Sequence, residues 1–493
     1  MTAQANTRKM VRGGLWLTIS FVIAKLSQFI SQLFLARLLS PTEFGIWGMV
    51  LIVTTLSAQF KEHAVSSVLI QRGIENKEQV DAIYSLGINL SILMFILQAS
   101  IGYPISRFFG YAELWPLIAC AGLVFIIGAG SGAREAVLQR QMNFQQVAIC
   151  ESCMGFARLG GAVGVAALGC GVWSFVVGEL CMELTNAVCS RWLCRYRFNY
   201  HLIPDRKALQ EVKSYITSVI VINLAVYANT NSDNFWVGKV LGASSLGFYS
   251  VAYQLAMLPT FALSQINKVS FSVLSQRDRT GQQMYVCKLV ELYAVVCAPI
   301  YSLGFIIAPW LIPGLYGAAW TAAVVPFQIV LVFAYARGFM AILGTALNAM
   351  NRPDINAVIN WVLVPISVPA FYLGAQFGGT TGVAIAVALV MGIGATLWFW
   401  IAICRAAQWR LSTLANPIFL PTAIGVAAIY FSYILSQIAE SMPLYAFGIL
   451  GMTMLQPVLF IGIYATGLSL LSRGRVPKML HSLIYDSIKP KET

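Results

Sequence analysis

Apolar runs long enough to span a lipid bilayer follow one another along the whole chain, and they constrain its fold more than any other feature. A transmembrane helix needs about 20 predominantly apolar residues. Only 10% of the residues are charged and 58% are hydrophobic, whereas about 25% of a soluble chain is charged. The sequence therefore predicts an all-α membrane protein with 14 transmembrane helices. The runs cover residues 13–38, 44–66, 80–107, 112–138, 145–169, 171–194, 213–238, 244–271, 283–312, 321–349, 354–376, 379–404, 417–439 and 445–471.

Basic residues predict the orientation of these helices. The first run follows Arg8, Lys9 and Arg12 without a small-residue cleavage site, so it is expected to be a retained helix and not a signal peptide. Of the 32 Lys and Arg residues, 26 fall in alternate connections or at the adjoining helix ends, three lie at the opposite side and three lie within the apolar runs. Cytoplasmic loops carry an excess of Lys and Arg, so both chain termini are predicted to be cytoplasmic. Because the net charge of +13 is dispersed between the spans, it favours contact with membrane lipids and argues against nucleic acid.

A corner motif between two apolar runs occurs twice. The stretch "LARLLSPTEFGIWGMVLIV" begins at Leu35, and "VGKVLGASSLGFYSVAYQL" begins 202 positions later at Val237. In this register Gly45 falls on Gly247. Each copy opens a unit of six predicted helices, an even number, so both units enter the membrane in the same direction. The sequence therefore predicts two six-helix lobes related by a parallel repeat, with two extra C-terminal helices.

This repeat divides the chain into four parts. Residues 1–194 form an N-lobe of helices 1–6, and residues 195–212 form a basic cytoplasmic linker. Residues 213–405 form a C-lobe of helices 7–12, and residues 406–493 hold helices 13–14 and a cytoplasmic tail. In transporters built from such repeats, the substrate path lies between the two lobes near the bilayer midplane. Functional residues are therefore expected at mid-depth.

Four motifs, spread over about two-thirds of the chain, resemble those of a known transporter family. They are "ARLLSPTEFGIW" (36–47), "LQRQMNF" (138–144), "VLGASSLGFYSVAYQLAMLP" (240–259) and "LYGAAW" (315–320). In these motifs the chain resembles the Wzx-type polysaccharide and oligosaccharide flippases. These form the exopolysaccharide export family of the multidrug/oligosaccharidyl-lipid/polysaccharide exporter superfamily. The resemblance implies a two-lobe flippase of the bacterial inner membrane, and not an enzyme.

The same resemblance implies a substrate and a mechanism. Undecaprenyl-pyrophosphate-linked oligosaccharide is expected to move from the cytoplasmic to the periplasmic leaflet, for exopolysaccharide or lipopolysaccharide synthesis, while the lobes rock in alternating access. The chain contains no G-x-x-x-x-G-K-[ST] phosphate-binding loop. No cofactor is therefore expected, and a proton or a sodium ion is the candidate coupling ion. A polysaccharide polymerase or chain-length complex is a candidate partner.

Ionisable side chains inside the apolar runs are the candidates for substrate binding. A charge at mid-helix costs about 2.5–3.5 kcal/mol on insertion scales, so one retained there is expected to have a function. Lys25 shares one helical face with Gln28 and Gln32, and Arg337 lies midway along the tenth run. Lys25 is the first candidate to contact the pyrophosphate, and Gln28, Gln32 and Arg337 are also predicted to bind substrate. The alternative for Lys25 is structural pairing with an acid on another helix.

Arg158 has two interpretations. It lies at nearly the same predicted depth as Glu183 on the following helix, so the first interpretation is a buried ion pair between the two side chains. Substrate binding by Arg158 is the other. Glu179 lies one turn from Glu183, and Glu151 lies two turns from Arg158. The acid left outside the pair, Glu179 or Glu151, is a candidate proton carrier, and all three acids are candidates for ion coupling.

The seventh apolar run is unusually polar and contains Asp233. This residue resembles the acidic residue with which the related lipid II flippases hold sodium, so a cation site is one hypothesis, with Asn360 as a second ligand. Hydrogen bonding between helices is the other hypothesis. Cys150 and Cys153 lie one helical turn apart without a second Cys or His pair within reach, so no metal site is predicted.

Two other functions fit part of the sequence. A multidrug or cation antiporter of the same superfamily would share the architecture, but Lys25, Arg337 and the two extra C-terminal helices argue against it. A membrane polysaccharide polymerase would need catalytic groups in a substantial outer loop, and the predicted outer loops are only a few residues long. The flippase is therefore the preferred hypothesis, and no catalytic residue is predicted.

Overall fold

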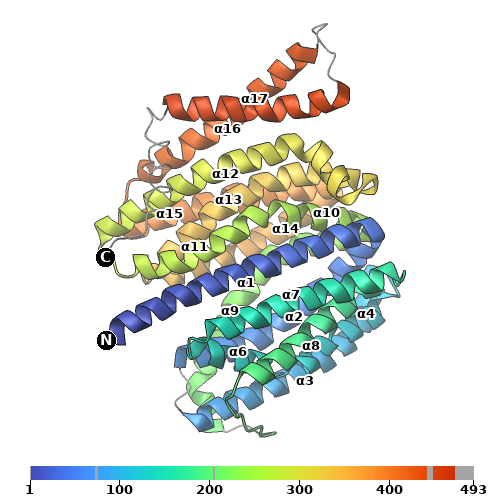
Figure 1. Ribbon diagram of the computed structural model, residues 1–493, viewed down its shortest axis with the longest axis vertical. Coiled ribbons are helices and arrows are strands. Elements are labelled where there is room, and N and C mark those ends of the chain that lie inside the picture. Colours follow the sequence, from blue (N-terminus) through green and yellow to red (C-terminus); the bar gives the residue numbers. More distant parts are fainter. Residues whose placement is uncertain (1, 73–75, 204–205, 441–447, 472–493) are drawn as a thin grey trace. The chain divides into compact units, whose positions relative to one another are not determined.

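Helices joined by short connections make up the protein (Figure 1). The computed structural model describes residues 2–72, 76–203, 206–440 and 448–471, and no β-strand occurs among them. The predicted start of the last run at 445 and the predicted tail after residue 471 lie outside these ranges. Contacts between residues divide the chain into two units. Unit 1 is Met1–Ser250 with Phe371–Thr380, and unit 2 is Val251–Ala370 with Thr381–Thr493.

Unit 1 holds the first nine α-helices and the start of the tenth. They are α1 (Thr2–Leu38), α2 (Pro41–Arg72), α3 (Lys77–Phe109), α4 (Leu114–Ala121), α5 (Leu123–Ile127), α6 (Ser131–Arg140), α7 (Phe144–Ala167), α8 (Trp173–Leu193), α9 (Arg206–Trp236), the π-helix η1 (Val237–Leu241) and α10 (Ala243–Ala256). Helix α1 packs against α7, and α7 packs against α8. Helix α2 packs against α3, α6 and α9. The contacts therefore group α9 with the first half of the chain, while the lobe boundaries of the repeat stay a prediction.

Unit 2 holds most of the remaining helices. They are α11 (Leu258–Leu274), α12 (Arg279–Tyr316), the 3₁₀-helix η2 (Ala318–Ala323), α13 (Val324–Ala349), α14 (Pro353–Ala386), the π-helix η3 (Val387–Gly394), α15 (Ala395–Ala407), α16 (Ser412–Glu440) and α17 (Gly448–Leu471). Helix α12 packs against α13 and α16, and α16 packs against α17. Tyr293 of α12 stacks on Tyr335 of α13 and meets Phe339 edge-on, which ties these two helices together.

Seven helical segments of the described part are long and apolar enough to cross a membrane, and the bent α4–α6 segment is an eighth candidate. The seven are Ile19–Leu38, Pro41–Gln59, Lys77–Phe109, Arg279–Tyr316, Ala318–Ala349, Pro353–Ala407 and Ser412–Gln437. The chain is therefore an all-helical, multi-pass membrane protein, as the apolar runs predicted. The count of 14 transmembrane helices stays a prediction.

Glycines mark two breaks in the helices, one inside a predicted apolar segment and one at a predicted border. The run 112–138 is divided into α4, α5 and α6 and bends by 44° before α6, where Gly130 has a left-handed φ of 83°. Gly379 interrupts α14 with φ 59° and ψ −147°, at the border predicted between the runs 354–376 and 379–404. A residue with a Cβ rarely adopts these angles, so glycine lets the chain turn at both places.

The two copies of the corner motif pack against each other within unit 1. A Cβ added to Gly45 would overlap the backbone carbonyl of Ala243, and one added to Gly247 would overlap the backbone carbonyl of Pro41. Ala243 and Gly247 each follow their counterpart, Pro41 or Gly45, by 202 positions. The contact is therefore reciprocal: each glycine meets the first residue of the other copy's helix, as at a two-fold interface.

Candidate substrate and ion site

Helix α1 contributes the polar face that the sequence predicted. Lys25 is partly buried, and its Nζ donates to Oε1 of Gln28 at 3.1 Å, one turn further along. Gln32 continues the same face, and its Nε2 is buried without a hydrogen-bond partner among the described residues. A Cβ added to Gly155 of α7 would lie only 3.4 Å from the Cα of Ala24. The lack of a side chain at Gly155 therefore lets α7 approach α1 closely beside Lys25.

Arg158 of α7 forms a salt bridge with Glu179 of α8, and both side chains are mostly buried. The prediction that Arg158 pairs with Glu183 was wrong. Small residues at the helix crossing explain the difference: a Cβ on Gly178 would lie 2.8 Å from the Ala162 Cβ and 3.3 Å from the carbonyl oxygen of Arg158. The closest approach of the helices therefore falls at Gly178 and brings the next residue, Glu179, to Arg158.

The other two acids of α7 and α8 have different surroundings. Glu151 of α7 accepts a hydrogen bond from Ser20 Oγ of α1 at 2.6 Å. The carboxylate of Glu183 lies against Gly128, where a Cβ would overlap it. Gly128 precedes the bend before α6, so Glu183 occupies the space that this break leaves.

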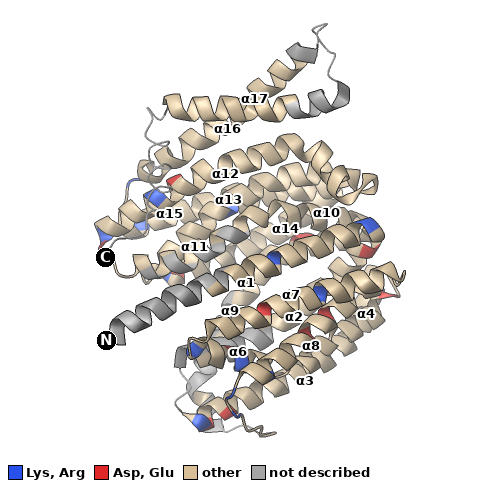
Figure 2. Cartoon of the chain, in the orientation of Figure 1, with Lys and Arg blue, Asp and Glu red and all other residues tan. Residues whose placement is uncertain are grey.

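Lys25, Glu151, Arg158 and Glu179 together form a group that we call the charged cluster. Figure 2 shows basic and acidic residues partway along α1, α7 and α8, away from the helix ends. Arg158 lies within electrostatic range of Lys25. The group holds two cations and two carboxylates, and its formal charge is zero when all four are ionised. Three of the predicted substrate and ion residues thus lie with Lys25 on packed helices of unit 1.

Asp233 of α9 is buried, with 2% of its surface exposed. The phenol of Tyr249 on α10 donates to its Oδ2 at 2.7 Å, and the backbone N–H of Asn234 donates to its Oδ1 at 2.8 Å. These contacts match the hydrogen-bonding hypothesis for this residue. No group of three or more His, Cys, Asp or Glu side chains suited to a metal ion occurs in the described ranges. The cation role of Asp233 stays a prediction.

The predicted residues of unit 2 lie on α13 and α14. Arg337 is partly buried on α13, with its guanidinium 5.7 Å from the ring centre of Phe333, one turn earlier. None of the described acidic residues forms a salt bridge with it. Asn360 on α14 donates to the backbone carbonyl of Asn356 at 2.8 Å and to its side-chain Oδ1 at 2.9 Å.

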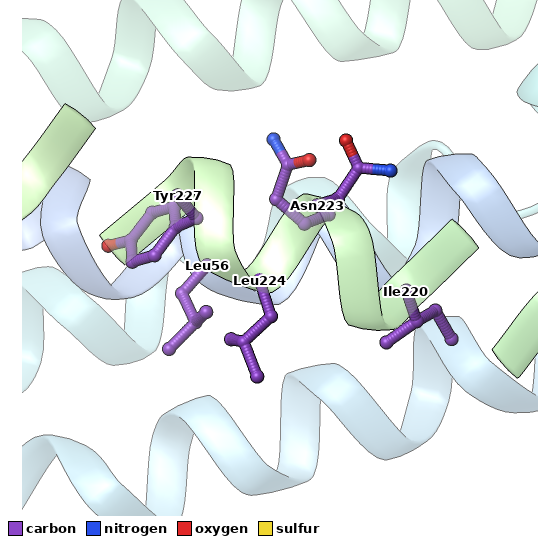
Figure 3. A pocket seen from close by; sticks show the side chains of 6 residues that line it. Leu56, Ile220, Asn223, Leu224 and Tyr227 are labelled. Atoms are coloured by element: carbon purple, nitrogen blue, oxygen red, sulfur yellow. The ribbon is translucent and has the colours of Figure 1, made fainter. Parts of the chain in front are cut away.

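A small pocket lies between α2 and α9. Figure 3 shows that Ile220, Asn223, Leu224 and Tyr227 line it from α9 and Leu56 lines it from α2. The lining is mainly apolar, and the Tyr227 hydroxyl donates to the backbone carbonyl of Ile52. The sequence marked α9 as polar but did not predict this pocket, because its other wall comes from a helix about 170 residues earlier.

Gln98 is a buried polar residue that the sequence predictions did not include. It is fully buried on α3, and its Nε2 donates to Thr54 Oγ1 of α2 at 3.1 Å and to the carbonyl of Ile118 on α4 at 2.8 Å. A glutamine inside an apolar run is the signal that could have found it. It links three helices of unit 1 and is expected to stabilise them.

Known proteins resemble the chain over most of its length. The family described as "Polysaccharide biosynthesis protein" matches residues 34–325, which is more than half of the sequence. A curated relative, "Uncharacterized membrane protein in cps region" of Klebsiella pneumoniae, is 24% identical over 84% of this chain and 86% of its own length. "Lipopolysaccharide biosynthesis protein WzxC" of Escherichia coli (strain K12) is 22% identical over 88% of each chain.

Two solved structures share the fold. "Lipid II flippase MurJ, inward closed conformation" superposes with a TM-score of 0.68 and 14% identity, over 93% of this chain and 100% of that chain. An inward-facing multidrug resistance MATE family transporter of the MOP superfamily superposes with a TM-score of 0.62 and 15% identity, over 80% and 99% of the two chains. At this identity the likeness establishes the fold alone.

Proposed function

Since the chain belongs to the polysaccharide biosynthesis protein family, we propose that it is a flippase for lipid-linked oligosaccharides. Membership confirms the family that the corner motifs indicated. The substrate is an undecaprenyl-pyrophosphate-linked repeat unit, which moves from the cytoplasmic to the periplasmic leaflet for exopolysaccharide or lipopolysaccharide synthesis. The observation that carries the proposal is the match of residues 34–325 to this family on a fold shared with a lipid II flippase.

The fold alone fits a multidrug antiporter equally well, because a MATE transporter also shares it. The family match and the WzxC relative favour the polysaccharide branch. An enzyme such as a polymerase is disfavoured, because the named structural neighbours are a flippase and a transporter. The flippase hypothesis is therefore the one that the comparisons support.

Two similar lobes would give such a carrier its alternating access. The reciprocal packing of Gly45 on Ala243 and of Gly247 on Pro41 supports a parallel repeat, and the superposition on the whole of the lipid II flippase chain supports a complete transporter fold, to which this proposal assigns 14 transmembrane helices. In this proposal the protein lies in the bacterial inner membrane with both termini in the cytoplasm, because the basic residues concentrate on one side. A polymerase or chain-length complex would take over the product outside.

Substrate binding is proposed for Lys25 and its neighbours. A pyrophosphate needs cations in a path that excludes lipid, and Lys25 lies with Gln28 and Gln32 on one face of α1. Arg158 is engaged by Glu179, so a phosphate oxygen would compete with that carboxylate for the guanidinium. Arg337 is the candidate cation of unit 2, and no described acid pairs with it.

Ion coupling is proposed for the carboxylates near these cations. Protonation of Glu179 would release Arg158 to a phosphate oxygen, which would link proton binding to substrate binding at one ion pair. Glu151 and Glu183 are the further proton candidates, and Asp233 is the candidate for sodium. Transport measured in proteoliposomes separates these choices. An ionophore that removes the proton gradient and one that removes the sodium gradient are added in turn, and the coupling ion is the one whose gradient transport requires, if it requires either.

The experiment that tests the function removes the protein from a strain that makes the polymer and locates the lipid-linked intermediates. A flippase defect leaves completed lipid-linked repeat units in the cytoplasmic leaflet, where a membrane-impermeant periodate reagent added outside spheroplasts does not oxidise their sugars. Opening the membrane then makes them reactive. Repeat units that are oxidised from outside and remain unpolymerised would contradict the proposal and favour a polymerase.

A further inference from the structure

The segment that follows α8 is fixed along α3 and is not a free linker. Residues 194–203, which we call the strap, form no helix or strand. The backbone N–H of Asn199 donates to Oδ1 of Asp81 at 3.0 Å, and that of His201 donates to Oγ of Ser85 at 3.0 Å. Asp81 and Ser85 are both buried on α3, one turn apart. Two side chains of one helical face therefore hold two alternate backbone groups of the strap.

A third residue of the same helical face continues this contact. The side-chain Nδ2 of Asn89 donates to the backbone carbonyl of Leu202 at 2.9 Å, and the hydroxyl of Tyr200 donates to Oδ1 of Asn89 at 2.9 Å. Asn89 follows Asp81 by two turns of α3. The strap thus advances along α3 by about 12 Å, at about 1.5 Å per helical residue.

Apolar and basic side chains alternate along the first part of the strap. Phe198 stacks on Tyr84 of α3, with ring centres 4.5 Å apart, and Tyr196 packs on Phe198 and on the buried cluster that contains Tyr84. Burial, with a smaller effect of the Asp81 carboxylate, raises the pKa of the Tyr196 phenol. Arg195 and Arg197 are exposed. In an extended chain successive side chains point to opposite sides, so the packing of the aromatic pair turns both arginines outward.

The strap changes from basic to apolar in the direction in which α3 enters the membrane. Exposed apolar residues of α3 begin at Ile92 and continue through Ile101, so its lipid-facing part starts about one turn beyond Asn89. Leu202 and Ile203, at the level of Asn89, are 74% and 78% exposed. The exposed arginines precede them and flank Tyr196, which lies near Asp81 of α3. Since Asp81 precedes Asn89 by about two turns, this position corresponds to the depth of lipid headgroups.

The end of α8 adds to this surface. Arg191 is exposed, and Trp192 is 84% exposed although it is the largest side-chain type in the protein. Tryptophan is enriched at membrane–water interfaces, and arginine there contacts phosphate groups.

We propose that the strap and the end of α8 form a docking surface for anionic phospholipids. Arg191, Arg195 and Arg197 bind the headgroup phosphates, while Trp192 and the Leu202–Ile203 pair enter the adjoining acyl-chain boundary. The lipids belong to the leaflet at the N-terminal end of α3. This inference requires a membrane protein but does not depend on the substrate proposed above.

Charge and depth favour a lipid surface over a soluble protein partner. The three arginines have complementary charge to anionic headgroups, and the exposed apolar pair lies beside a transmembrane helix where acyl chains begin. Each basic residue near an anionic surface contributes about fivefold in affinity. The three together are therefore expected to enrich anionic lipid at Trp192 on the order of 100-fold over zwitterionic lipid.

Quenching of Trp192 by brominated lipids tests the proposal. The full-length protein is placed in nanodiscs of phosphatidylcholine with increasing brominated phosphatidylglycerol or, separately, brominated phosphatidylcholine. The signal of Trp192 is the difference between the parent protein and its Trp192→Phe variant, because the chain has 12 tryptophans. Given the enrichment above, the fraction of brominated phosphatidylglycerol that quenches half of the Trp192 signal is expected to be lower than that of brominated phosphatidylcholine by roughly tenfold or more.

Two charge variants complete the test. The triple change Arg191→Gln, Arg195→Gln and Arg197→Gln is expected to abolish the preference for the anionic quencher, since it removes only exposed charges. The double change Arg277→Gln and Arg279→Gln, at exposed positions before and at the start of α12, is expected to retain it. Equal quenching by both lipids in the parent protein, or a preference that survives in the triple variant, overturns the proposal. Trp192 that neither lipid quenches also overturns it and favours a protein partner.

Discussion

Lys25 is a charged residue inside an apolar helix, where its ammonium group needs polar contacts. It lies within the apolar segment Ile19–Leu38, and Gln28 accepts one of its three donors. Arg158 lies within electrostatic range but has Glu179 as its partner. Two cations on packed helices thus have different immediate contacts, so substitution at each is expected to have a different effect.

Removal of the Lys25 charge is expected to reduce export. Lys25→Ala should lower polymer output by about 10–100-fold, since a charge-assisted contact is worth about 1.5–3 kcal/mol, and Lys25→Arg should retain a measurable part. Lys77→Ala, at an exposed position, is the matched control. Polymer output is measured at equal protein abundance in the membrane. Normal output from Lys25→Ala would rule out the proposed role of this residue.

The Arg158–Glu179 pair is expected to stabilise the packing of α7 on α8. Arg158→Gln or Glu179→Gln should each cost about 1–3 kcal/mol, because each leaves a mostly buried charge without its partner. The double variant should cost less than the sum of the two. Unfolding in mixed micelles measures all three, and Glu183→Gln tests the pairing that the sequence suggested. Strictly additive losses for Arg158 and Glu179 would contradict a direct interaction.

At the scale of elements, glycine contacts determine how closely helices approach. Gly45 and Gly247 lie against backbone carbonyls of the opposite corner, and backbone cannot move aside as a flexible side chain can. Gly178 has the same effect between α8 and α7. The charged cluster therefore depends on residues that carry no charge, because they bring its helices into contact.

Filling the corner is expected to destabilise unit 1. Gly45→Ala and Gly247→Ala should each lower the free energy of unfolding by about 1–3 kcal/mol, the usual cost of overpacking. Gly164→Ala is the control, since nothing lies within 4 Å of the added Cβ. Thermal unfolding of the purified variants in detergent gives the comparison. A corner variant as stable as Gly164→Ala would show that the two motif copies do not pack as described.

At the scale of the whole molecule, the orientation of the protein in the membrane is the most important prediction, because the direction of transport depends on it. The basic side of the bundle is expected to face the cytoplasm. Reporter fusions check this: alkaline phosphatase fused after Gly110 should be active outside, and phosphatase fused after His201 should be inactive. A fluorescent protein at the same two sites should give the reverse pattern. Activity after His201 would contradict the predicted orientation and that of the strap.

Much of the fold was predictable from the sequence. Apolar runs marked the described helices, and the seven membrane-spanning segments fall within them or overlap them, because the bilayer demands the same length and polarity of every span. The repeated corner was visible as a motif, and its family followed from it. The bend before α6 was not predicted, because Gly130 is one of 40 glycines and most of them lie in regular helix.

The candidate site was predicted as a set of residues but not as a set of pairs. Lys25 and Gln28 share a turn of one helix, so their contact follows from helical spacing. Equal depth in the membrane pointed to Glu183 as the partner of Arg158, but depth carries no information on where two helices cross. The strap was interpreted as part of a linker because residues 195–212 are rich in basic residues, and its anchors on α3 lie more than 100 residues earlier.

The sequence by itself determined the class of protein, the family and the helices that bear the candidate charges, because these depend on composition, periodicity and local motifs. Only the tertiary structure decided that Arg158 pairs with Glu179, that Tyr249 binds Asp233 and that the strap lies along α3. These contacts depend on the crossing and rotation of helices distant in the chain. Small residues such as Gly155 and Gly178 set that geometry through packing, which no one-dimensional pattern records.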